Sequence, residues 1–182
     1  MRISFLPALL AGSTFCVFAP VAAVGADEAA IIASAESAAP AAIAKEAAVV
    51  TVDAEGHMTT LREGQNGYTC IPDVPETPGP DPMCADQGWM GWMKAWMAHE
   101  PPPQGLVGMG YMLAGGSDPD NLDPFALQPS SGRDWVTTGP HLMVFSVGAD
   151  LSAYPGGAQP DTTKPYVMYP DTPYAHLMLP LQ

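Results

Sequence analysis

Positive charge is scarce in this chain. Of its 182 residues, six are Lys or Arg and nineteen are Asp or Glu, so the formal net charge is −13 and the isoelectric point is near 4.3. Nucleic acids and anionic membrane surfaces attract proteins through clustered positive charge. The composition therefore predicts an acidic protein with no nucleic-acid partner and no electrostatic attachment to a membrane.

Long apolar runs are also absent, except at the N-terminus. Arg2 precedes an apolar stretch over residues 3–24, and Val24-Gly25-Ala26 places small or compact residues where a signal peptidase cleaves. We therefore predict a signal peptide over residues 1–26 and export to the periplasm or out of the cell. Nothing later in the chain is long enough to span a bilayer, so no membrane span is expected after cleavage.

Cysteine is rare. With Cys16 inside the predicted signal peptide, the mature chain keeps only Cys70 and Cys84, which are separated by thirteen residues. Two cysteines in an exported protein allow one intramolecular pair, and a reactive pair would favour C-x-x-C spacing. We predict a structural disulfide between Cys70 and Cys84, which stabilises the fold by about 3 kcal/mol through loop closure.

The motifs of the common enzyme classes are missing. The sequence contains no G-x-S-x-G, no H-E-x-x-H, no phosphate-binding P-loop and no G-x-G-x-x-G after a strand. No catalytic residue is therefore assigned, and whether the protein is an enzyme stays open. One alternative is a small periplasmic hydrolase or lyase, in which His141 or His176 is a general base and an acid comes from the 118–123 loop.

The residues that are present suit one domain of mixed structure. Hydrophobic residues make up 47% of the chain, enough for a core, while 21 Pro and 18 Gly predict frequent loops. Residues 27–46 are Ala-rich and are expected to form a marginal helix or a tether, followed by a single domain over 47–182. Strands are predicted at 47–53, 57–62, 68–71, 106–113, 135–137, 141–147, 166–169 and 174–179, the first three as a meander. The predicted fold class is α+β, with a mainly antiparallel sheet of short strands, one amphipathic helix and long Pro/Gly loops.

That helix has the clearest pattern in the chain. Asp81 is predicted to cap it, Pro82 to occupy its first position, and the prolines from Pro101 to end it. Its apolar stripe follows helical spacing and consists of Trp89, Trp92, Met93, Trp96 and Met97. Such a stripe usually packs on a sheet; alternatively, the three tryptophans form a partly open platform for a sugar or an aromatic ligand.

Two strands carry the same tripeptide, His-Leu-Met. Because strand side chains alternate, His141 and Met143 share one face, as do His176 and Met178. If the strands are neighbours, the four side chains form a soft ligand set, which is selective for copper and especially for Cu(I). The alternative is that both methionines fill the core and both histidines join buried hydrogen bonds.

An acidic loop follows Gly115-Gly116. Asp118, Asp120 and Asp123 offer hard oxygen ligands of the kind that calcium binds, although the spacing does not match an EF-hand. Asp and Asn near Pro also form ordinary turns, so the loop is either a calcium site or a structural turn.

Four longer strings are distinctive in combination. They are GYTCIPDVPETPGPDPMCAD at 67–86, YMLAGGSDPDNLDPFA, WVTTGPHLMV and TPYAHLMLPL. Together they resemble a group of small exported bacterial proteins of unassigned function, over about residues 45–182. The resemblance implies a single exported domain and supplies no activity, cofactor or catalytic residue.

These observations predict a small exported binding module. Its site would be lined by aromatic, His and Met side chains, and would lie between the Trp helix and the strands that bear His141 and His176. The ligand is undetermined, with copper and calcium as the candidate metals. Besides the hydrolase, a further alternative is an envelope interaction protein that binds a protein partner through its Pro/Gly loops and takes no small ligand.

Overall fold

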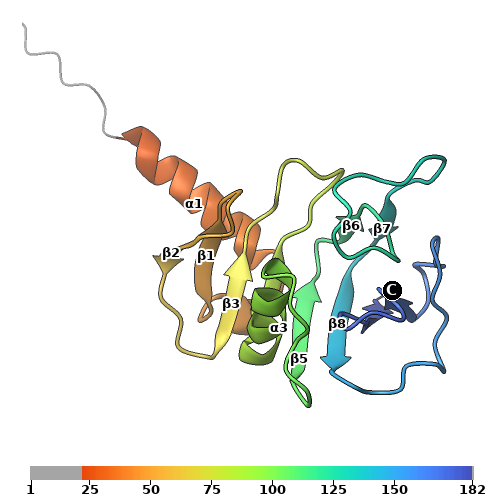
Figure 1. The fold of residues 1–182 in the computed structure, drawn as a ribbon. Helices are drawn as coiled ribbons and strands as arrows, with labels where there is room; N and C mark the ends of the chain where they lie inside the picture. The colour runs from red at the N-terminus through yellow and green to blue at the C-terminus, as the bar shows by residue number, and fades with distance from the viewer. Residues whose placement is uncertain (1–21, 182) are drawn as a thin grey trace, which may run out of the picture.

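The computed structural model describes residues 22–181, so most of the predicted signal peptide lies outside the described residues. Within them, an eight-stranded and a two-stranded sheet are accompanied by helices (Figure 1). The helices are α1 (Ala22–Glu36), α2 (Ala41–Ala44) and α3 (Gln87–Met97). The strands are β1 (Ala48–Val52), β2 (Met58–Arg62), β3 (Tyr68–Ile71), β4 (Met83–Asp86), β5 (Val107–Met112), β6 (Gly116–Asp118), β7 (Val136–Thr138), β8 (His141–Ser146), β9 (Tyr166–Met168) and β10 (His176–Pro180). The α+β class with a mainly antiparallel sheet is confirmed.

The order of the large sheet is β2-β1-β3-β4-β5-β8-β10-β9. Its neighbours are antiparallel except β1 and β3, which run parallel with Val49 opposite Cys70. The predicted meander is therefore wrong, because β3 lies beside β1 and not beside β2. The physical reason is a backbone crossing: a Cβ on Gly64 would lie 2.1 Å from the Ala48 nitrogen, so the chain passes over β1 where only Gly fits. Asn66 then donates to the Ile43 carbonyl at 2.8 Å, which ties the turn before β3 to α2.

The main helix begins later than predicted. Residues 83–86 form β4, with Cys84 opposite Cys70 in the ladder, so Asp81 and Pro82 precede a strand and not a helix. Asp86 is the N-cap and accepts a hydrogen bond from the Trp89 amide at 2.8 Å. Its other oxygen accepts from the Met109 amide at 3.1 Å, so one carboxylate fixes both the helix start and the adjacent strand β5.

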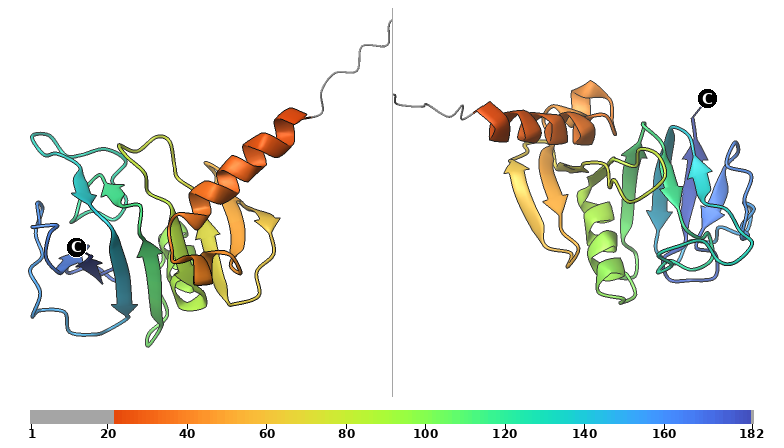
Figure 2. Two further views of the ribbon diagram at one scale, coloured as in Figure 1. Left: turned by 180° about the vertical axis from the view of Figure 1, so that it is seen from behind. Right: turned by 90° about the horizontal axis from the view of Figure 1, so that it is seen from above.

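Helices cover both faces of the sheet (Figure 2). On one face, small buried side chains of the Ala-rich segment, including Ala35, Ala38 and Ala44, pack against the bridge between Cys70 and Cys84. The other face carries α3 and the larger core. The Ala-rich segment is thus helical and its C-terminal part is packed against the domain. None of the described helices has the length and apolar character needed to cross a membrane.

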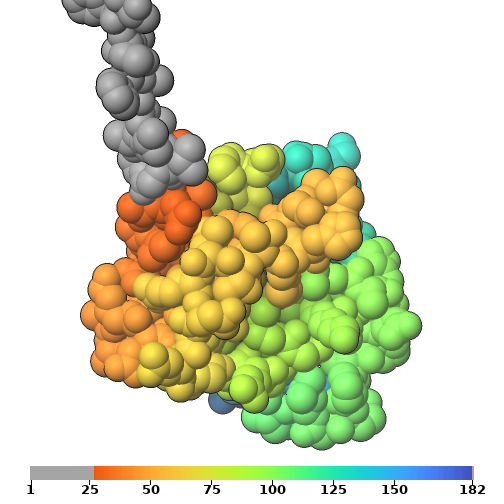
Figure 3. Space-filling model, turned by 90° about the vertical axis from the view of Figure 1, so that its left-hand side faces the viewer, coloured from red at the N-terminus to blue at the C-terminus, as the bar shows by residue number. Residues whose placement is uncertain are grey.

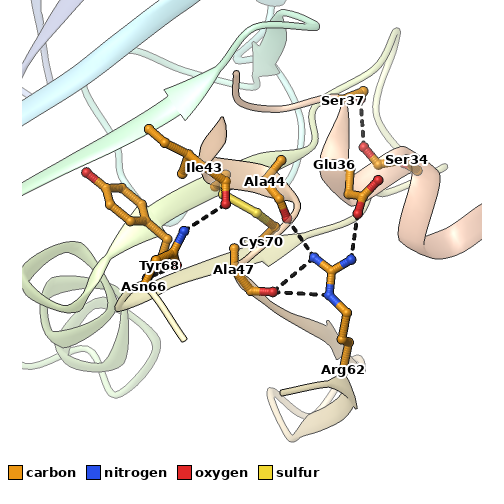
Figure 4. Close-up of a disulfide and its surroundings, with 11 residues drawn as sticks. Ser34, Glu36, Ser37, Ile43, Ala44, Ala47, Arg62, Asn66, Tyr68 and Cys70 are labelled. Carbon is orange, nitrogen blue, oxygen red and sulfur yellow. Dashed lines mark hydrogen bonds and ion pairs between the residues drawn. A yellow bond between two sulfur atoms is a disulfide. The ribbon is translucent and has the colours of Figure 1, made fainter. Parts of the chain in front are cut away.

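Arg62 on β2 fixes the Ala-rich segment to the sheet edge (Figure 4). Its guanidinium donates to the Ala44 carbonyl at 2.6 Å, to the Ala47 carbonyl at 2.9 Å and to Glu36 at 2.5 Å. Figure 3 views this end of the molecule, where the gold β1–β2 segment lies between α1 and the green region that contains α3. One partly buried cation therefore satisfies two main-chain carbonyls at the end of α2.

Like the boundary between β1 and β3, the seam between β4 and β5 is held by two residue pairs. Only Cys84–Tyr111 and Ala85–Gly110 pair across it, whereas six residue pairs join β5 to β8. Helix α3 lies over this seam very closely, since a Cβ on Gly108 would lie 2.4 Å from the Trp89 nitrogen. Glycine at that position is what allows the helix to rest on the strand.

Candidate ligand-binding site

A pocket of about 320 Å³ lies between α3 and the sheet face that α3 covers. All three tryptophans of the helix line it, together with seven of the chain's eleven methionines. The seven are Met83, Met93, Met97, Met112, Met143, Met168 and Met178. Its polar lining comes from His176, Ser117, Asp81, Asp118 and Tyr169. Thioether and indole surface therefore dominates a cavity that contains a single imidazole.

The tryptophans both pack and line the pocket. Trp89 and Trp92 are buried, and the Trp92 ring lies parallel to that of Trp96 with centroids 6.4 Å apart. The Trp96 indole nitrogen donates to the Pro124 carbonyl at 2.8 Å, whereas the buried Trp92 nitrogen has no hydrogen-bond partner within residues 22–181. The two interpretations of the apolar stripe are thus compatible, because the same side chains cover the sheet and face the cavity.

His176 is held in one orientation. Its ring meets the rings of Trp89 and Trp92 edge-on, with centroids 5.2 and 5.4 Å away, and its Nδ1 lies 3.0 Å from the Tyr174 carbonyl oxygen. A carbonyl oxygen can only accept, so Nδ1 carries the proton. Burial lowers the pKa of His176 to about 4, which keeps the ring neutral at pH 7. Its Nε2 therefore carries a free lone pair.

The equivalent histidine on β8 makes the same bond and is near enough to help lower the pKa of His176, but it lies outside the pocket lining. His141 Nδ1 lies 2.7 Å from the Gly139 carbonyl oxygen, and burial lowers its pKa as well. Its Nε2 is buried without a partner in the described part of the chain, and the residue is not part of the pocket lining. The strand register places His141 opposite Pro180, whereas His176 is opposite Met168.

The structure therefore brings together three of the four side chains predicted as a soft ligand set. Met143 and Met178 are paired directly across β8 and β10, and both line the pocket with His176. His141 does not line the pocket, whereas Met168 on β9, which is opposite His176, does. No pattern in the sequence marks Met168 as a site residue, although its strand was predicted, because nothing in the sequence shows that β9 pairs with β10.

Asp118 on β6 gives the pocket a carboxylate. Burial and the nearby Asp81 raise its pKa to about 7, while the Tyr169 hydroxyl, which donates to its Oδ1 at 3.5 Å, acts in the opposite direction. Tyr169 has a left-handed backbone with φ of 55°, which is unfavourable for a bulky side chain. The strain is held by the Tyr169 amide, which donates to the Asn121 carbonyl at 2.9 Å.

The chain matches no protein-family model, no curated protein and no solved structure. Its function is therefore inferred from the geometry and chemistry of the pocket.

The acidic loop does not gather its carboxylates. Asp118 lies on β6, which sequence analysis placed in a loop, and it faces the pocket. Asp120 is bound by Arg133 at 2.9 Å and by the Leu122 amide at 2.7 Å, while Asp123 accepts from the Phe125 amide at 2.9 Å. Each carboxylate thus has a separate role, and the turn interpretation describes Asp120 and Asp123.

Within residues 22–181, one group of acidic and His side chains is close enough to share an ion. It consists of Asp53, Glu55 and His57, all exposed in the turn between β1 and β2. Asp53 Oδ1 accepts hydrogen bonds from the Glu55 amide at 3.1 Å and the His57 amide at 2.8 Å. These bonds explain the cluster as the closure of a turn.

Proposed function

We propose that the protein is an exported binding module that holds a compact ligand in the Trp/Met pocket. The observation that carries the proposal is the lining of the 320 Å³ cavity, which combines three indoles and seven thioethers with one oriented imidazole. Ligand sites in proteins are typically apolar concavities with a few fixed polar groups. Here His176 and Asp118 are those groups.

Export is supported by the N-terminal sequence and by the bridge between Cys70 and Cys84. Helix α1 runs through the proposed cleavage point after Ala26. Cleavage there leaves Asp27 and Glu28 in the first turn of the shortened helix, where negative charge is favourable. Processing is thus compatible with the packed part of α1.

The pocket suits binding better than general-base catalysis. A base works best when its pKa is near the operating pH, and burial lowers that of His176 to about 4. The proton of His176 Nδ1 is bound by a main-chain carbonyl and not by a carboxylate. The envelope interaction alternative would fit two buried histidines, but it gives no role to seven methionines around one cavity.

Binding of a neutral fluorescent probe tests the proposal. N-phenyl-1-naphthylamine is compact and apolar, so we expect its fluorescence to rise on saturable binding of one molecule per chain. Met97→Trp narrows the pocket and should weaken binding about tenfold, the loss of roughly 1.4 kcal/mol of contact. Met90→Trp is the matched control, since Met90 is on the same helix, is also half-buried and does not line the pocket. No saturable binding, or equal binding by both variants, would refute the proposal.

A further inference from the structure

We propose that the ligand of this pocket is monovalent copper, held by His176 Nε2 and the thioethers of Met143, Met168 and Met178. The inference rests on the proposed binding function and names its ligand. It begins from the arrangement of three adjacent strands, β8, β10 and β9.

The strand register gathers these four side chains on one face. His176 is opposite Met168 on β9, and Met178 is opposite Met143 on β8. Directly opposed residues have Cβ atoms about 5 Å apart, and residues two apart on a strand lie about 7 Å apart on the same face. Methionine has an unbranched, adaptable side chain, so each sulfur can turn toward the imidazole. All four residues line the cavity.

The nitrogen ligand is already prepared for a metal. A metal-binding histidine usually donates its other ring proton to a carbonyl or a carboxylate, which fixes the tautomer and the ring plane. His176 Nδ1 makes this bond to the Tyr174 carbonyl at 3.0 Å. No proton has to leave the ring when a metal binds at Nε2.

The chemistry of the donors selects the ion. Thioethers and a neutral imidazole are soft, uncharged ligands, which favour Cu(I) over calcium or magnesium. Zinc sites in proteins are usually completed by thiolates, but Cys70 and Cys84 are joined in a disulfide and point to the opposite sheet face. Uncharged ligands do not neutralise the charge of the bound ion. The free-energy cost of placing that charge in a low-dielectric cavity is smaller for a monovalent than for a divalent ion.

Asp118 offsets that remaining charge. It is on the pocket wall, and one carboxylate balances one Cu(I) without being a ligand. The other acid in the lining, Asp81, is already bound by the Val74 amide at 2.9 Å and the Thr77 hydroxyl at 2.5 Å. Asp118 accepts the longer bond of 3.5 Å from the Tyr169 hydroxyl, so it is the less firmly bound of the two carboxylates that can offset one positive charge.

The first test observes the ligands directly in the unmodified protein. Cu(I) is added anaerobically as its acetonitrile complex to protein carrying ¹³C-labelled methionine methyl groups. We expect one equivalent to shift the signals of Met143, Met168 and Met178, and to leave those of Met58 and Met109 unchanged. Ag(I), which has no accessible redox change, should move the same three signals. Shifts confined to other methionines, or none at one equivalent, would overturn the assignment.

Competition with the chelator bathocuproine disulfonate then measures affinity. His176→Phe should weaken Cu(I) binding more than about 100-fold, beyond the 10–100-fold cost of an outer-shell change. His141→Phe is the matched control, because His141 begins the same tripeptide, makes the same backbone bond and does not line the pocket. Equal affinity for the two variants would overturn the copper site.

Met168→Leu keeps the volume and removes only the sulfur, so it separates lost ligation from lost folding. We expect it to weaken Cu(I) binding about tenfold while Met90→Leu leaves it unchanged. Probe binding without Cu(I) binding would refute the copper ligand and leave the binding function standing. Absence of both would refute the two together.

Discussion

Breaking the bridge between Cys70 and Cys84 tests how the structure orders its most proline-rich loop. The cysteines are 14 positions apart, fully buried, and directly opposed in the β3–β4 ladder. Closing a loop of this length removes about 3 kcal/mol of chain entropy from the unfolded state. Reduction should therefore lower the free energy of unfolding by about 3 kcal/mol.

Replacing the cysteines should cost more than reducing them. Cys70→Ala with Cys84→Ala also removes two buried sulfur atoms, at about 1 kcal/mol each, so the expected loss is about 5 kcal/mol. Urea unfolding followed by tryptophan fluorescence measures both values, because Trp89 and Trp92 are buried. The double variant also controls for the reductant itself, because it has no disulfide and reductant should not change its urea midpoint. A loss below about 1 kcal/mol on reduction would refute the loop-closure reasoning.

Three further predictions concern packing, a cation and a carboxylate. A Cβ on Gly108 would lie 2.4 Å from the Trp89 nitrogen, so Gly108→Ala should lower the free energy of unfolding by about 2–3 kcal/mol in the same urea assay. Gly139→Ala is the control, because its Cβ meets nothing within 4 Å, and it should change stability by less than about 0.5 kcal/mol. Arg62→Met leaves the Ala44 and Ala47 carbonyls without their donor and should lower the free energy of unfolding by about 1–2 kcal/mol. Lys45→Met removes only an exposed ion pair with the same Glu36 and should lower it by less than about 0.5 kcal/mol. Equal losses in the two variants would show that the bonds to the carbonyls do not contribute. The pKa of Asp118 is about 7 in the folded state, against an ordinary value of 3.8. Between these two values the native protein retains a proton that the unfolded chain releases, so the free energy of unfolding falls as the pH rises from 4 to 8. Asp118→Asn removes this pH dependence. Thermal unfolding should therefore show that the free energy of unfolding of the variant, relative to that of the unmodified protein, increases by up to about 4 kcal/mol as the pH rises over this range. A difference that stays constant with pH would contradict the raised pKa.

Local patterns were sufficient for most individual elements. Apolar runs and turn residues located seven of the strands that join the large sheet, and the spacing of Trp89, Trp92 and Trp96 located α3. The start of that helix was missed because Asp81-Pro82 and Asp86 are both plausible caps. What decides between them is the pairing of Cys84 with Cys70, a contact between distant segments.

Strand order depended on contacts that no local pattern contains. The Asn66-Gly67 turn has the sequence of a hairpin, yet Asn66 is bound to Ile43, 23 residues away. That single hydrogen bond belongs to the packing of α2 on the sheet. The Ala-rich segment, which carries little local signal, thereby influences where β3 pairs.

The sequence predicts which types of side chain line the pocket but not which particular residues they are. The two His-Leu-Met strands are neighbours, as the soft-metal hypothesis requires, yet their antiparallel register separates His141 from His176 along the strands. Alternation along a strand fixes which side chains share a face, while register fixes which of them meet. Met168 and Asp118 enter the site only through register and through the small β6–β7 sheet.

The side chains that line the pocket come from both sides of the seam between β4 and β5. Val52 and Ile71 reach the cavity from one side of the seam, while Met143 and Met168 reach it from the other. Few backbone bonds join the two sides, and the rest of the contact is made by α3, which rests on Gly108, and by the Asp86 carboxylate, which accepts from the Met109 amide. The four proposed copper ligands all lie on β8, β9 and β10, on one side of that line, so a bound ion ties these three strands together and leaves the pairing of β4 with β5 unchanged.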